Sequence, residues 1–66
     1  MSITGVKVKL IGEDGNAFSI LGRVTGAMRR AGVSKEIIKE YHNKATEGDY
    51  DNLLKVTMDY VDEGGD

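Results

Sequence analysis

The residues best suited to binding chemistry lie on one strip of a single predicted helix. Four of them recur at intervals of four, three and four residues and so share one helix face: Ser19, Arg23, Gly26 and Arg30. Arginine side chains form paired hydrogen bonds with phosphate or carboxylate oxygens, and glycine lets a ligand approach the helix backbone. The strip therefore predicts an anion-binding site.

The same strip has a structural interpretation. Two glycines inside one helix, Gly22 and Gly26, would let a second helix pack closely, with the arginines in solvent or paired with acidic side chains. A further interpretation makes the strip an interface with a foreign protein. Both interpretations, the ligand site and the helix crossing, can hold together if two copies of the chain cross at the glycines. The arginines of both copies would then surround one ligand.

Two residues outside the strip belong to the predicted ligand-binding set, Asn16 and Tyr50. Tyr50 could stack on a base, as exposed aromatic rings do, or serve as a core residue. Asn16 ends residues 12–16, a glycine-containing loop with the gross form of a phosphate cradle, and it is also a good N-cap. The loop lacks the lysine and the glycine spacing of nucleotide-binding motifs, and Glu13 and Asp14 would repel a phosphate. A turn is the better interpretation of this loop.

Catalytic and metal sites are not expected. The chain contains no cysteine and one histidine, His42, for which the sequence supplies no orienting partner. Asp49 and Asp51 stand at a predicted helix start, where capping and the helix dipole explain them without a metal. We therefore predict no enzyme activity, no metal and no cofactor.

Length and charge restrict the class of protein. A 66-residue chain is a single domain, residues 1–66, whose own core is marginal. Without cysteines or a histidine cluster, self-association is the remaining way to stabilise it. The net charge of -2 argues against a general nucleic-acid binder. Basic residues concentrate in the first part of the chain and acidic ones in the last, so head-to-tail pairing and a simple solvated surface both remain open.

One strand is clear from the sequence. Residues 3–11 alternate apolar side chains with Lys7 and Lys9, which indicates a half-buried strand. Its backbone groups need a partner, and either residues 55–61 or a second copy of the chain must supply it. Residues 63–66 are expected to be frayed.

Three helices should follow the strand. They are predicted over residues 14–31, 34–48 and 49–62 from apolar residues spaced three and four apart. The expected N-caps are Asn16 or Asp14, then Ser34, then Asp49, and the expected terminating glycines are Gly32 and Gly48. Residues 55–61 also alternate as a strand would, but the helical pattern covers more residues. The predicted fold class is α+β: one N-terminal strand and three short helices, completed by homo-oligomerisation.

Several segments resemble one known family. The segments IGEDGNAFSILGRV, AMRRAGVS, ATEGDYDNLL and MDYV resemble very small proteins of bacteriophage and prophage genomes, over residues 6–62. The resemblance implies a phage or mobile-element origin. Small phage proteins of this kind often blunt host immunity, by sequestering nucleotide signals or by plugging an effector.

The expected function is binding without catalysis. We expect a small phage-type protein that captures an anionic, nucleotide-like ligand between its subunits, in the cytoplasm of the host bacterium. The alternative is an inhibitor that binds a host defence protein through the same arginine- and glycine-bearing helix. No membrane partner is expected, since no apolar run approaches the roughly 20 residues of a membrane span and the N-terminus lacks signal-peptide features.

Overall fold

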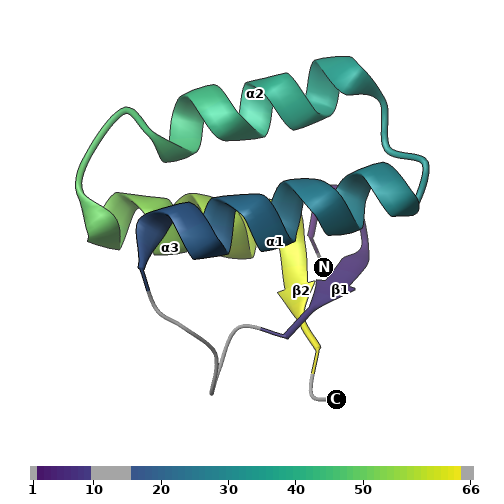
Figure 1. Ribbon diagram of the computed structural model, residues 1–66, viewed down its shortest axis with the longest axis horizontal. Helices are drawn as coiled ribbons and strands as arrows, with labels where there is room; N and C mark the ends of the chain where they lie inside the picture. The colour runs from purple at the N-terminus through teal and green to yellow at the C-terminus, as the bar shows by residue number, and fades with distance from the viewer. Residues whose placement is uncertain (1, 10–15, 65–66) are drawn as a thin grey trace.

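The computed structural model describes residues 2–9 and 16–64, which form three helices and a two-stranded sheet (Figure 1). The elements, in chain order, are β1 (Val6–Val8), α1 (Ala17–Arg30), α2 (Lys35–Ala45), α3 (Tyr50–Tyr60) and β2 (Val61–Glu63). In Figure 1, α1 and α3 run in the same direction, α2 runs opposite to both, and the sheet lies on the side of α1 away from α2. The described part of the chain therefore has the predicted α+β character.

The partner of the first strand lies within the same chain. β1 pairs in parallel with β2, with Val6 opposite Val61 and Val8 opposite Glu63. The ladder continues beyond the strands, since the backbone N–H of Gly64 donates to the carbonyl of Val8 at 2.8 Å. The pairing leaves β1 with no need of a second copy. The argument for self-association from an unpaired strand is therefore removed.

The extent of the first strand and the order at the C-terminal end of the chain both differ from the prediction. β1 covers only Val6–Val8 because Gly5 adopts a positive φ of 71°, which sets a bend before the strand. Residue 9 is described but is not part of β1, and the predicted strand residues 10 and 11 lie outside the described residues. At the other end of the chain, residues 63 and 64 were expected to fray but are held by the sheet; residues 65–66 lie outside the described part.

The predicted N-caps are confirmed at all three helices. The side chain of Asn16 accepts from the N–H of Ser19 at 2.9 Å. The equivalent bonds run from Ile37 to Ser34 at 3.3 Å and from Asn52 to Asp49 at 3.0 Å. Each bond satisfies a backbone donor that the first helical turn cannot.

The ends of the helices agree less well with prediction. Gly32, with φ 84°, follows α1 as expected. Gly48 does not end α2, which stops at Ala45 with Thr46 as its C-cap. The Thr46 hydroxyl and N–H both donate to the carbonyl of His42, at 2.8 and 3.1 Å, so the final carbonyls are satisfied before Gly48 is reached. The third helix continues to Tyr60, as favoured, and only then becomes a strand.

The core lies between the three helices and the inner side of the sheet. Its fully buried side chains include Val24 and Met28 of α1, Tyr41 of α2, and Tyr60 and Val61 at the junction of α3 and β2. The rings of Tyr41 and Tyr60 stand 5.5 Å apart, tilted by 58°. This is a favourable aromatic geometry, and it joins α2 to the end of α3.

Two buried tyrosines bring polar groups into this core. The hydroxyls of Tyr41 and Thr57 hydrogen bond at 2.7 Å, and the Tyr60 hydroxyl donates to the Glu40 carboxylate. Burial raises the pKa of Tyr41, although its bond to Thr57 acts in the opposite sense. Burial also raises the pKa of Tyr60, and the bond to Glu40 raises it further.

We expect the protein to lose stability in alkaline solution. A raised pKa means that the folded state keeps phenolic protons which the unfolded chain releases near the ordinary value of 10.0. The stabilisation is therefore complete below about pH 10 and is lost as the pH rises through the folded-state values. Thermal melts at about pH 8 and about pH 11 should show a falling Tm, and Tyr60→Phe should reduce the fall. A Tm that is the same at both pH values would contradict this expectation.

Candidate functional site

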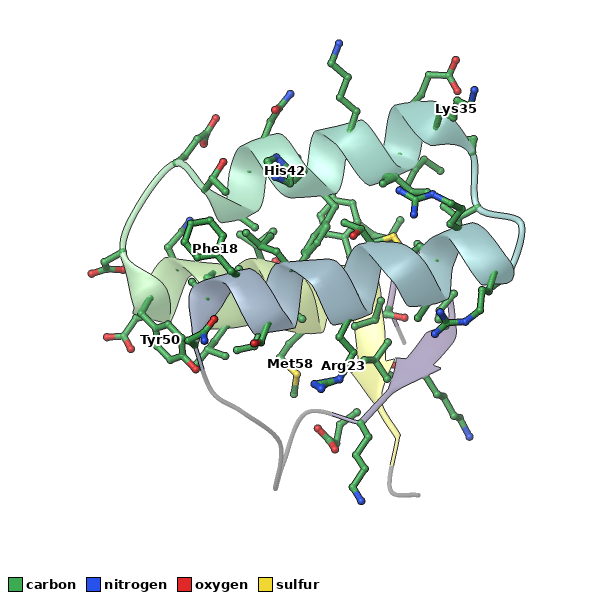
Figure 2. All side chains as sticks on the ribbon, viewed as in Figure 1. Phe18, Arg23, Lys35, His42, Tyr50 and Met58 are labelled. Carbon is green, nitrogen blue, oxygen red and sulfur yellow. The ribbon has the colours of Figure 1, made fainter. Side chains whose placement is uncertain are left out.

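A groove of about 740 Å³ opens between α1 and α2. The two helices are joined by the short turn at residues 31–34 and lie antiparallel (Figure 1), so the last turn of α1 faces the first turn of α2. Figure 2 shows His42 on α2 and Lys35 at its beginning. The groove thus draws its lining from both helices and from the turn between them.

Cationic side chains dominate the polar lining. Arg29 comes from α1, and Lys35 and Lys39 come from α2. All three are exposed, and within the described part of the chain they form no ion pair. Among residues 2–9 and 16–64, no carboxylate lines the groove. A protein with a net charge of -2 therefore presents a locally positive groove.

The floor of the groove is apolar. Val33 and Ile38 are partly buried and pack against the core, which fixes their position. Uncharged polar groups complete the lining: Thr25, Asn43 and the imidazole of His42. The Thr25 hydroxyl donates to the carbonyl of Leu21 at 2.8 Å, which leaves its oxygen free to accept a hydrogen bond. Charged rims over an apolar floor suit a ligand that carries both an anionic and a flat apolar part.

The predicted strip is placed elsewhere on α1. Ser19, Arg23 and Gly26 are half-buried and Arg30 is exposed, and Figure 2 shows Arg23 on the sheet side of α1, away from α2. None of the four lines the groove. A Cβ built on Gly26 would lie 3.5 Å from the Arg30 guanidinium, so the strip's own arginine covers the bare backbone there.

The other two predicted site residues lie at the opposite end of the helices from the α1–α2 turn, beside which Arg29 and Lys35 stand. Asn16 caps α1, and its side chain accepts a bond from Ser19. Tyr50 begins α3 and lines a second hollow, of about 260 Å³, together with Phe18 and Asp49. Phe18 is 87% exposed and Tyr50 is 42% exposed. The structure therefore does not bring the six predicted residues into one site.

Sequence reasoning missed most of the groove. Lys35 and Lys39 are four residues apart on one helix, and so are Thr25 and Arg29. This spacing places each pair on one helix face. The two pairs form one groove only because α1 packs against α2. His42, expected on a solvated helix face, is exposed and also borders the groove.

Across residues 2–9 and 16–64, no group of three potential metal-ligating side chains is brought together. The helices in the described part of the chain are too short or too polar to cross a membrane.

Comparisons of the chain with protein-family models, with curated proteins and with solved structures find no match.

Proposed function

We propose that this protein binds a small anionic, nucleotide-like ligand in the groove between α1 and α2, without catalysing a reaction. The observation that carries the proposal is the lining that the described residues supply: three cations and no carboxylate above an apolar floor. The ligand class is the one expected from the sequence, but the residues that bind it are different.

The phosphate groups belong at the end of the groove near the turn. Arg29 can bind two phosphate oxygens at once, and Lys35 is the first residue of α2, where free N–H groups and the helix dipole favour an anion. Lys39 lies one helical turn further along. Each of these charge-assisted bonds is stronger than a bond between neutral groups.

The flat part of the ligand belongs over Val33 and Ile38. An apolar floor removes a base from water, and burial of apolar surface contributes about 25 cal/mol per Å². His42 and Asn43 stand at the edge of this floor and offer hydrogen-bonding groups to a heterocycle. The cations supply charge recognition, and these side chains supply shape.

Binding without catalysis is supported by the surroundings of His42. A general base needs a partner that orients it. Within the described residues, the His42 ring has no hydrogen bond to a carboxylate. In the setting suggested by the resemblance to phage proteins, the ligand is a host nucleotide signal, and the protein acts by sequestering it.

The proposal predicts a specific pattern among arginine and lysine variants. Titration calorimetry with a panel of mononucleotides and cyclic dinucleotides should identify a ligand. Arg29→Ala and Lys39→Ala should each weaken its binding by about 10- to 150-fold, because a charge-assisted bond contributes about 1.5–3 kcal/mol. Arg30→Ala is the matched control, since Arg30 is the next residue but does not line the groove, and it should change binding less than about twofold.

Two results would contradict the proposal. If Arg30→Ala and Arg23→Ala weaken binding while Arg29→Ala does not, the predicted strip is the site and the groove is not. If no member of the panel gives heat or a thermal shift, the alternative of a protein-binding inhibitor is favoured over ligand capture.

A further inference from the structure

The face formed by α1 and α2 carries opposite charges at its two ends. The end beside the α1–α2 turn holds Arg29, Lys35 and Lys39. At the other end of the α1–α2 pair, the turn into α3 and the first turn of α3 hold exposed acidic side chains: Glu47, Asp49 and Asp51. One exposed residue of the opposite sign lies near each end, Glu36 beside Lys35 and Lys44 before the α2–α3 turn. Figure 1 shows these two turns at opposite ends of the helices. A face of this kind is complementary to an inverted copy of itself.

A large apolar side chain projects from the acidic end of this face. Phe18 is 87% exposed and stands at the N-terminal end of α1, at the opposite end from Lys35 (Figure 2). A single exposed apolar residue is ordinary on a monomer. Here the same face also contains an apolar floor, Val33 and Ile38, inside the cationic groove.

Gly22 lies between Phe18 and the groove. It is exposed, and a Cβ at this position would meet nothing within 4 Å, so the α1 backbone is open to a close approach. At a rise of about 1.5 Å per residue, Phe18 lies about 6 Å to one side of Gly22 along the helix axis and Arg29 about 10 Å to the other. A two-fold axis through Gly22 would therefore place Phe18 over the floor of the partner's groove.

We propose that two copies of this chain form a symmetric, antiparallel dimer through the α1–α2 face, crossing at Gly22. Phe18 of each copy enters the groove of the other and covers Val33 and Ile38. The acidic end of each copy meets the cationic end of its partner. The two-fold symmetry produces two such contacts in the dimer.

The size of the molecule indicates the strength of this dimer. With extents of 28 × 25 × 20 Å, one face offers a contact at the lower end of specific interfaces, roughly 1,000 Å² in total. A micromolar dissociation constant is therefore expected rather than a nanomolar one. Electrostatic attraction between exposed charges also makes the association weaker in salt, because the Debye length falls to about 3 Å at about 1 M.

The dimer and the proposed ligand compete for the same groove. Phe18 of a partner and a bound nucleotide cannot both occupy the floor, so ligand binding should shift dimers to monomers by mass action. The dimer itself is independent of the ligand. The two ideas are separable with Phe18→Ala, which removes the dimer contact and leaves every groove residue in place.

The experiment is sedimentation equilibrium of the ligand-free protein, from about 10 μM to about 1 mM, at low and high salt. Wild type should dimerise at low salt, and Phe18→Ala should raise the dissociation constant at least about tenfold. Ile3→Ala is the control, because Ile3 is also an exposed apolar residue, 60% accessible, but precedes the sheet. It should leave the association unchanged.

The Gly22→Leu variant tests whether Gly22 is part of the dimer interface or matters only for the stability of the helix. Leucine is the better helix former, and a Cβ at this position would meet nothing within 4 Å, so the variant should melt at a higher temperature than wild type. It should nevertheless dimerise more weakly, because its side chain blocks the crossing.

Charge reversal tests the antiparallel arrangement. Lys39→Glu and Glu47→Lys should each weaken the homodimer, and an equimolar mixture should restore it, since both contacts of the mixed dimer join opposite charges. Monomeric wild type at about 1 mM in low salt would overturn the proposal. So would Phe18→Ala that dimerises as wild type, or a mixture that associates no better than its components.

Discussion

A chain that ends at Tyr60 should be largely unfolded at room temperature. The truncation removes β2, including Val61, whose side chain is fully buried, and it exposes Val8 of β1. Each buried valine contributes about 1.5–3 kcal/mol, and each lost ladder bond about 0.5–1.5 kcal/mol. A domain of this length has a total stability of only about 3–10 kcal/mol. Far-UV circular dichroism and urea titration would measure the loss.

The matched control for this truncation is a chain that ends at Gly64. It keeps β2 and the bond from the Gly64 N–H to the Val8 carbonyl. Its urea midpoint should stay close to that of the whole chain. A cooperative, wild-type transition in the chain that ends at Tyr60 would show that the parallel strand pair contributes little.

The second large effect is expected at Tyr41. Its side chain is fully buried, packs on Tyr60 and hydrogen bonds to Thr57. Tyr41→Ala removes a large aromatic side chain from the core, a change that costs about 3–5 kcal/mol in comparable cases. Most of the free energy of unfolding should therefore be lost, and chemical denaturation would measure it.

Two further substitutions separate the packing from the polar contribution. Tyr41→Phe keeps the ring but leaves the buried Thr57 hydroxyl without its Tyr41 partner, at a cost of about 1–3 kcal/mol. Tyr41→Phe combined with Thr57→Val removes both hydroxyls and should recover part of this loss. If the double variant were less stable than the sum of the single changes predicts, the hydroxyl pair would not be the cause.

The beginnings of the helices follow from the sequence alone. Asn16, Ser34 and Asp49 each accept a hydrogen bond from a backbone N–H three residues later. Both groups of each bond lie within four consecutive residues, so no distant part of the chain decides whether it forms. The apolar spacing that placed Val24 and Met28 on the buried face of α1 is equally local.

The strand pair required the tertiary structure. β2 is three residues long, Val61–Glu63, and its sequence contains no clear alternation. It pairs with residues that lie more than fifty positions earlier in the chain. Its partner could not be chosen from local pattern, because a parallel pair needs a long connection whose path is set by packing. Here that connection contains three helices. Because residues 55–60 are helical, α3 ends directly at the start of β2.

The groove also depends on how two separate helices pack against each other. The sequence predicted an anion site on cationic side chains of α1, and it chose Arg23 and Arg30 from the spacing of one helix. Arg29 joins Lys35 and Lys39 only because α1 and α2 pack antiparallel across the turn at residues 31–34. Helical periodicity shows which residues of one helix share a face. Which faces of two helices meet is decided by the burial of the core, where Met28 and Tyr41 are both fully enclosed.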